Sequence, residues 1–302
     1  GDDRAAWARG ELFGGARAAR THGAALVHCP ANFGPLRSRV PVVLTIHDLL
    51  AFRHPEYVPG AYARVLRTMI RLAAGVARRV VTVSGASRDD IVRLLGVPPG
   101  RIDITPLAGS ARAPVGSGER PRPARRDDLL LAVGNRMPHK GFETLLDALA
   151  RIAPDERATL VITGSHGDDP LAPIVERLGL GASVELRGWL SHDELDELYA
   201  RATALVFPTR FEGFGLPPLE AMARGCPVIA SDIPVVHEVA GDAAMYVDPA
   251  DAEAMAEAIQ TLQDSPLQRA RMTEAGLQRA ATFSWDATAL ATRAAFLRAP
   301  ER

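Results

Sequence analysis

Two glutamates and a glycine pair stand close together in the segment FPTRFEGFGLPPLEAMARGCPVIASD, residues 207–232. Glu212 directly precedes Gly213, Gly215 comes two residues later, and Glu220 follows shortly after them. Apolar patterns on both sides predict strands, so the segment should run strand, glycine loop, helix, strand. Ionised carboxylates accept hydrogen bonds from hydroxyl groups, and glycines let backbone amides approach a ligand closely. These residue types suit a ligand that carries both hydroxyls and an anionic group.

The helix that holds Glu220 should begin at two prolines, Pro217 and Pro218, because proline favours the first helical positions. The amino end of a helix favours an anion. We therefore expect Glu212 and Glu220 to face one cleft with a phosphate group between them. A nucleoside-diphosphate sugar offers this combination, since a diphosphate joins a ribose diol to sugar hydroxyls. The simpler alternative is a capping carboxylate at an ordinary strand-to-helix turn.

A second segment that could bind an anion is AVGNRMPHKGFETLL, which leaves a predicted strand and enters a predicted helix. Its connection contains Gly134, Arg136 and Lys140, and we expect both basic side chains to neutralise a leaving diphosphate. Of the 35 basic residues, Lys140 is the only lysine. An ammonium is a compact point charge that the planar guanidinium does not reproduce, so this position could require lysine. A solvated basic loop is the alternative.

In the first part of the chain, His47 ends the strand pattern VPVVLTIHD. A histidine at the carboxyl end of a strand can bond a substrate hydroxyl, and the alternative is a histidine bonded to the backbone. Ser84 is expected to cap the following helix. The remaining histidines show no metal-ligand spacing, so no metal site is predicted.

Strands and helices alternate along the chain, which predicts an α/β protein with parallel sheets. With 302 residues, two domains are expected. The segment 109–127 is dense in Gly, Pro, Ser and Arg and lacks periodicity, so it should divide them. The predicted organisation is a first Rossmann-like domain over 1–110, a linker over 111–127, a nucleotide-sugar-binding Rossmann-like domain over 128–282, and a last helix over 283–302 that crosses back to the first domain.

Bulk composition excludes several classes of protein. The formal net charge is −1, so nothing global indicates nucleic acid or an anionic surface as a partner. Two cysteines are too few for a disulfide framework, and no apolar run approaches membrane-spanning length. These features predict a cytoplasmic protein. On the helix near 61–79, Arg64, Arg67 and Arg71 fall on one side, which allows peripheral contact with anionic lipid, although a solvated arginine face is the simpler alternative.

The segment FEGFGLPPLEAMARGCPVIASD resembles the signature of the retaining glycosyltransferases of family 4, which have the GT-B fold of two Rossmann-like domains facing across a cleft. The similarity extends to AVGNRMPHKG, VPVVLTIHDLLAFRHPEYV and VVTVSGASRDDI, and it covers nearly the whole chain. Compared with that family, the first domain is expected to be shortened at its amino end. TIHDL, RHPEYV and RGW also resemble mannosyltransferases that act on polysaccharide.

The resemblance implies a role for each candidate residue. Glu220 would bind the ribose hydroxyls of the donor, and Glu212 and His47 would contact the transferred sugar. Arg136 and Lys140 would stabilise the departing diphosphate, beside Gly134. The base would pack near residues 186–190. The backbone amides that would hold phosphate and sugar are those of Gly213, Phe214, Gly215 and Leu216.

The implied activity is transfer of a hexose, with GDP-mannose as donor, to an acceptor hydroxyl that could be lipid-linked, without a metal or other cofactor. UDP-sugars remain alternatives for the donor. A non-catalytic nucleotide-sugar-binding module is the alternative from another functional class. A nicotinamide dehydrogenase would need a third glycine in the loop, so we set it aside.

Overall fold

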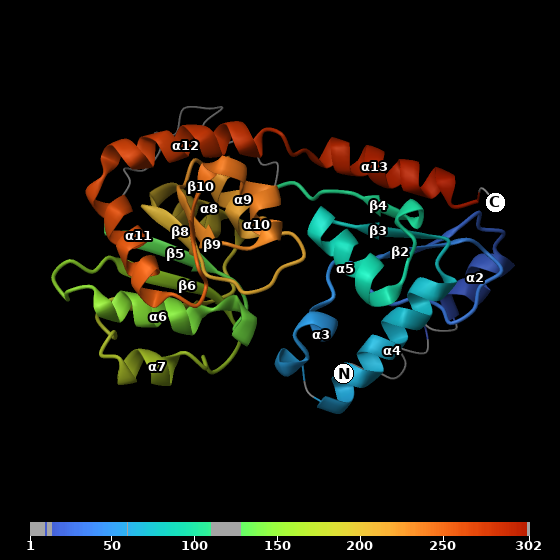
Figure 1. The fold of residues 1–302 in the computed structure, drawn as a ribbon, viewed down its shortest axis with the longest axis horizontal. Coiled ribbons are helices and arrows are strands. Elements are labelled where there is room, and N and C mark those ends of the chain that lie inside the picture. The colour runs from blue at the N-terminus through green and yellow to red at the C-terminus, as the bar shows by residue number, and fades with distance from the viewer. Residues whose placement is uncertain (1–9, 11–13, 59, 110–127, 301–302) are drawn as a thin grey trace. The chain divides into compact units, whose positions relative to one another are not determined.

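The computed structural model describes residues 10, 14–58, 60–109 and 128–300, and the chain divides into two compact units (Figure 1). The first unit comprises Gly1–Leu107 with Trp285–Arg302, and the second comprises Ala108–Ser284. The linker predicted over 111–127 lies outside the described residues. None of the described helices is both long and apolar enough to cross a bilayer.

The first unit contains a four-stranded parallel sheet in the order β1-β2-β3-β4. Its strands and helices are α2 (Gly15–Thr21), β1 (Val27–Cys29), β2 (Val42–Thr45), α3 (Leu50–Arg53), α4 (Gly60–Val76), β3 (Arg79–Thr82), α5 (Gly85–Leu95), β4 (Ile102–Ile104) and α13 (Trp285–Arg298), with short 3-10 turns at Pro55–Tyr57 and Pro99–Arg101.

Local chemistry explains where the elements of the first unit begin and end. Ser84 caps α5 by accepting a hydrogen bond from the Ser87 amide, as predicted, and Gly96 ends that helix at φ 70°. The helix α13 belongs to this unit, because Ala295 is buried with Val43 and Val81 of the sheet. Cys29 is buried and not disulfide-bonded.

The second unit contains a six-stranded parallel sheet in the order β10-β9-β8-β5-β6-β7. Its elements are β5 (Leu129–Val133), α6 (Phe142–Arg151), β6 (Thr159–Ser165), α7 (Ala172–Arg177), β7 (Val184–Gly188), α8 (His192–Arg201), β8 (Ala204–Phe207), α9 (Leu216–Ala223), β9 (Val228–Ser231), α10 (Pro234–Ala240), β10 (Ala244–Val247), α11 (Ala252–Asp264) and α12 (Pro266–Ala280), with 3-10 turns at Pro138–Lys140 and Gly241–Ala243.

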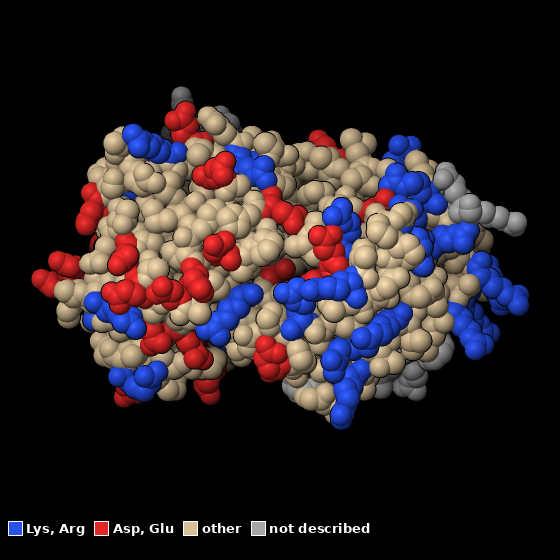
Figure 2. Space-filling view, in the orientation of Figure 1, with Lys and Arg blue, Asp and Glu red and all other residues tan. Residues whose placement is uncertain are grey.

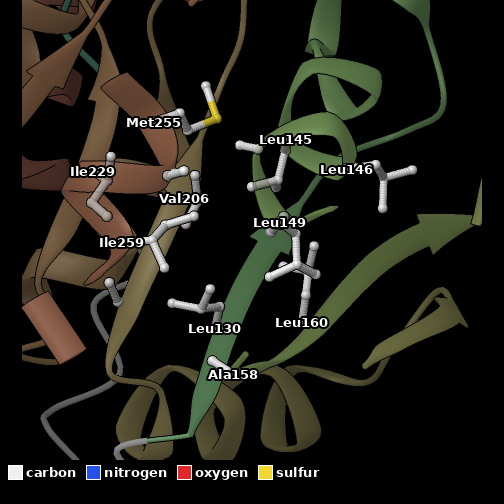
Figure 3. Close-up of a cluster of buried hydrophobic side chains, with 14 of the residues drawn as sticks. Leu130, Leu145, Leu146, Leu149, Ala158, Leu160, Val206, Ile229, Met255 and Ile259 are labelled. Atoms are coloured by element: carbon white, nitrogen blue, oxygen red, sulfur yellow. The ribbon is translucent and has the colours of Figure 1, made fainter. Parts of the chain in front are cut away.

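The core of the second unit lies between its sheet and the helices α6 and α11, which pack on each other. Leu145 and Leu149 of α6 lie near Leu130 of β5 and Ile259 of α11 in the apolar cluster of Figure 3. Burying such side chains stabilises the fold by about 1.5–3 kcal/mol each. The rigid sheet beneath this core fixes the loops that leave its carboxyl edge.

Candidate active site in the second unit

The strand order of the second unit places two loops side by side. From β5 the chain proceeds to β6 and β7 on one side, and it then returns to place β8 on the other side of β5. The direction of winding therefore reverses between β5 and β8. In open α/β sheets, ligands bind at the carboxyl ends of the strands where this reversal occurs. The loops that leave β5 and β8 there are residues 134–141 and 208–215, the two segments singled out from the sequence.

Close packing of backbone against backbone holds these two loops together. The amide of Arg210 donates to the carbonyl of His139 at 2.7 Å. Gly141 has φ 70°, and a Cβ at that position would lie 2.0 Å from the carbonyl oxygen of Pro208. Only glycine permits both the conformation and the approach. Gly141 therefore sets the spacing between the loops.

Lys140 and Glu212 form an ion pair across the two loops. The ammonium Nζ lies 2.6 Å from Oε1 of Glu212, and the two side chains are 16% and 14% exposed. A short charge-assisted bond in a partly buried setting is among the stronger polar contacts in proteins. The structure therefore brings together the lone lysine and the first glutamate of the motif, which are 72 residues apart in sequence.

Arg136, which was expected to neutralise a diphosphate, makes an ion pair within the second unit. Its side chain is 6% exposed, and the guanidinium pairs with Asp169 at 2.8 Å. Nε bonds both carboxylate oxygens, Nη1 donates to the carbonyls of Gly134 and Thr163, and Nη2 donates to Asp169 and the carbonyl of Ile162. All five N–H groups thus have protein acceptors. Arg136 thus anchors the β5 loop to the end of β6, and its expected role toward a diphosphate stays a prediction.

Asp169 is correspondingly held in its ionised form. Burial acts to raise the pKa of this carboxyl, but hydrogen bonds from Arg136 and the Leu171 amide, together with the charge of Arg136, hold the pKa below its ordinary value. Gly164 adds a second close contact, because a Cβ there would lie 2.5 Å from the carbonyl oxygen of Gly134. This contribution of Asp169 could not be predicted from the sequence, because its partner is 33 residues away.

Glu220 lies on α9, whose first residues have few backbone N–H groups that could donate hydrogen bonds. Pro217 and Pro218 have no N–H, so Leu216 supplies the one amide donor among the first three helical positions. Gly215 caps the helix at φ 101°, a conformation that favours glycine. Phe214 is buried, and its ring meets Phe283 edge-on. The backbone amides that were predicted to bind an anion are therefore confined to the turn that precedes the prolines.

The Glu220 carboxyl is half-buried beside a tyrosine that sequence reasoning missed. The hydroxyl of Tyr199 on α8 donates to Oε2 at 3.2 Å. Burial raises the pKa of Glu220, and the charge of Arg224 partly opposes this. Oε1 has no partner among the described residues, so it can accept a bond from a hydroxyl. A buried tyrosine usually requires a partner for its O–H, but the sequence shows neither the burial of Tyr199 nor its partner.

Residues 186–190, expected near the base of a nucleotide, follow the same edge of the sheet. Trp189, directly after β7, is exposed and stacks on His166, which follows β6, with ring centroids 5.4 Å apart. An exposed aromatic face is a surface on which a planar base can stack. The placement suits the expectation, which stays a prediction.

His47 belongs to the first unit, after β2. Its Nε2 lies 2.9 Å from the carbonyl oxygen of Pro30, so Nε2 must carry the donated proton and the neutral ring keeps Nδ1 as an acceptor. Its amide donates to Asn32, and its carbonyl accepts from Ser87. Both alternatives considered for this histidine remain: it bonds the backbone, and it retains one nitrogen that could accept from a hydroxyl. Its role toward a sugar stays a prediction.

Comparison of the whole chain with solved structures defines its fold class. It superposes on a sucrose-phosphate synthase from Thermosynechococcus elongatus with a TM-score of 0.74 at 24% identity, covering 93% of this chain and 75% of that one. For WaaG, described as a glycosyltransferase involved in lipopolysaccharide biosynthesis, the TM-score is 0.72 at 20% identity, with 93% and 80% covered. The fold is of the GT-B class, as predicted.

Sequence comparison assigns the family. The model described as glycosyl transferases group 1 matches residues 119–279, and the one described as glycosyltransferase family 4 matches residues 2–108. O-antigen chain mannosyltransferase B of Escherichia coli is 35% identical over 272 residues, which are 86% of this chain and 71% of that protein. The chain belongs to the glycosyltransferase family that these two models and this relative define. It is a hexosyltransferase because it belongs to that family.

Two further relatives show how much of their length this chain covers. O-antigen chain mannosyltransferase RfbU of Salmonella typhimurium is 32% identical, with 74% of this chain and 61% of that protein covered. The MMP alpha-(1->4)-mannosyltransferase of Mycolicibacterium hassiacum is also 32% identical, with 87% and 66% covered. The chain thus spans between 61% and 71% of the length of these relatives.

Proposed function

We propose that this chain transfers mannose from GDP-mannose to an acceptor hydroxyl, with retention of configuration, during the synthesis of a polysaccharide or glycoconjugate. Three relatives support mannose as the transferred sugar, because each of them is named as a mannosyltransferase. A neighbour of the same fold, HepE of Anabaena, was crystallised with UDP and glucose, so UDP-sugars are the competing donors to be tested.

In this proposal, α9 and the loop before it hold the donor. Oε1 of Glu220 accepts hydrogen bonds from the ribose diol, while Tyr199 orients the carboxylate through Oε2. The amides of Gly213–Leu216 bind phosphate and sugar oxygens. The base stacks near Trp189. Bringing a diol to a half-buried carboxylate favours its ionised form, because each new donor bonds the charged state.

Lys140 and Glu212 act on the group that is transferred. The bond between the anomeric carbon and the phosphate oxygen breaks, and a bond from that carbon to the acceptor oxygen forms on the same face. The departing phosphate oxygen takes the proton from the acceptor hydroxyl. Lys140 stabilises the charge that develops on the diphosphate, and Glu212 bonds hydroxyls of the sugar. We propose that no metal ion takes part, and undiminished transfer in the presence of EDTA would support this.

The observation that carries the proposal is the ion pair between Lys140 and Glu212 at the reversal of winding, with Glu220 on the adjoining helix. The test is release of nucleotide from GDP-mannose and from UDP-glucose in the presence of saccharide acceptors. We expect release with GDP-mannose and loss of at least 100-fold in Glu212→Gln. Saturable binding without any release would favour the non-catalytic module instead, and no response to any nucleotide would reject both.

We further propose that α4 holds the first unit against an anionic membrane, where a lipid-linked acceptor would lie. The solvent-facing side of α4 carries Arg64 and Arg71 together with exposed Val65 and Leu72, and this helix has no acidic residue. A basic face with apolar side chains is typical of helices that lie in the lipid interface.

Co-sedimentation with vesicles tests this contact. The chain should sediment with phosphatidylglycerol-containing vesicles and stay in the supernatant with neutral vesicles, and moderate salt should weaken the binding. Arg64→Gln/Arg71→Gln should abolish sedimentation. Equal recovery with both kinds of vesicle would refute the role of α4.

A further inference from the structure

A cavity of about 490 Å³ lies at the amino ends of β3 and β4, at the end of α4 and near the last turn of α13. Arg78, Arg79, Arg101 and Arg298 line it, and they come from three segments of the first unit: the start of β3, the turn before β4 and the end of α13. Its volume falls in the range of small-molecule sites, roughly 300–1000 Å³. It lies at the opposite edge of the sheet from His47, which follows the carboxyl end of β2.

The arginines outnumber the acid that neutralises them. Asp103 accepts two bonds from Arg79, at 2.8 and 2.7 Å, and a third from Arg298. No other acidic side chain pairs with these two arginines within the described part of the chain. One carboxylate is thus shared between two guanidiniums, while Arg101 adds a further positive charge to the same cavity.

Two of the guanidiniums keep donors for a ligand. Arg101 uses Nη2 to bond the carbonyls of Ala74 and Ala77 at the end of α4, which fixes its position. Its Nε and Nη1 have no protein acceptor among the residues described. Within the same described residues, Arg298 donates only to Asp103, and it does so through Nη2. A preorganised guanidinium with unused N–H groups is suited to bidentate contact with a phosphate.

The surrounding unit strengthens the attraction for anions. Its described residues include 15 arginines and six acidic residues, whereas those of the second unit include 12 basic and 24 acidic residues. Figure 2 shows basic side chains gathered over the elements of the first unit and acidic ones over those of the second. A net charge of the whole chain near zero conceals this separation, which raises the local concentration of anions near the first unit.

We propose that this arginine cavity is a second anion site, which binds a phosphate group and is separate from the donor site of the second unit. The ligand carries a phosphate dianion or phosphodiester, and its source is either a small phosphate compound in solution or the headgroup of an anionic lipid. The inference rests on residues of the first unit alone, so it does not depend on the activity proposed above.

Calorimetric titration of the full chain with inorganic phosphate at low salt tests the site. Four variants are compared with the parent: Arg101→Gln/Arg298→Gln, Arg298→Gln alone, Arg64→Gln/Arg71→Gln on α4, and Lys140→Gln in the second unit. We expect saturable binding to the parent and at least a tenfold loss of affinity in Arg101→Gln/Arg298→Gln. The α4 pair removes the same charge from the same unit and should bind phosphate within twofold of the parent, whereas Lys140→Gln measures how much phosphate the donor site binds.

Arg298→Gln keeps the test decisive if the double variant fails to fold, because this side chain is half-exposed and bonds Asp103 alone among the described residues; we expect about a threefold loss. Vesicles of phosphatidylglycerol identify the source. Loss of phosphate binding with vesicle binding intact indicates a small compound, and loss of both indicates a lipid headgroup. Absence of saturable phosphate binding in the parent, or loss in Lys140→Gln with retention in Arg101→Gln/Arg298→Gln, would overturn the proposal.

Discussion

The buried pair of Arg136 and Asp169 should be essential to both the stability of the second unit and the position of Lys140. We expect Arg136→Gln to lower the free energy of unfolding by about 3–5 kcal/mol, because removing one partner leaves a buried charge without compensation. Several carbonyls that Arg136 bonds would also lose a charged donor. The loop that carries Lys140 should then loosen, and transfer should fall with it.

A double-mutant cycle assigns this loss to the pair. Asp169→Asn should cost less than Arg136→Gln, because an amide oxygen still accepts from the guanidinium. In Arg136→Gln/Asp169→Asn no carboxylate is left unpaired, so the double variant should be more stable than the sum of the single losses predicts. The control is Arg151→Gln, which breaks an exposed ion pair with Glu253 in the same unit and should cost less than about 1 kcal/mol.

Urea unfolding, followed by circular dichroism between pH 4 and pH 8, provides the measurement. Since the folded-state pKa of Asp169 is depressed, its contribution is complete above the ordinary carboxyl pKa and is lost as pH falls through the folded value. The loss in Arg136→Gln should shrink toward pH 4 for another reason: without Arg136, burial raises the pKa of the Asp169 carboxyl, which can then protonate and shed its unpaired charge. A loss below 1 kcal/mol at pH 7, or strict additivity in the double variant, would refute this account of the anchor.

Three further outcomes follow from the site. Glu220→Gln should raise the melting temperature above pH 7. A carboxyl whose folded-state pKa is raised destabilises the fold as pH rises through that pKa, whereas an amide does not titrate. Equal pH profiles of the parent and the variant in a thermal-unfolding series would contradict this. Gly141→Ala should destabilise the second unit by at least about 1–2 kcal/mol from the left-handed backbone alone, with the clash against Pro208 adding to it, and a melting temperature unchanged from the parent would be inconsistent with that packing. Lys140→Arg should retain nucleotide affinity within about threefold yet slow transfer at least tenfold in steady-state kinetics; an unchanged kcat would mean that the ammonium is dispensable.

The alternation of strands and helices was predictable from the sequence because it follows from apolar periodicity. Buried strands such as β5 and β8 are continuous apolar runs, and Ser84 is a cap at the expected position. The loops at the carboxyl edge could be placed for the same reason, since a parallel α/β sheet leaves little choice about where its connections meet.

Pairings across long sequence separations could not be predicted. A loop arginine looks the same whether it faces solvent, a phosphate or a buried carboxylate, so the role of Arg136 depended on Asp169, which only the fold brings near. The bond from Tyr199 to Glu220 was hidden in the same way. The opposite charges of the two units, by contrast, could have been counted once residues 109–127 were recognised as the boundary between domains; the net charge of −1 averaged them away.

Calorimetric binding of GDP-mannose to the parent and to Glu220→Gln tests the central claim most directly, with Glu176→Gln, an exposed glutamate of the same unit, as control. Losing a charged acceptor for the ribose diol should cost about 1.5–3 kcal/mol, which weakens binding about 10- to 100-fold. We predict that affinity falls in Glu220→Gln while its thermal stability at neutral pH rises, and that Glu176→Gln matches the parent. Parent-like affinity in Glu220→Gln would contradict the assignment of the donor site.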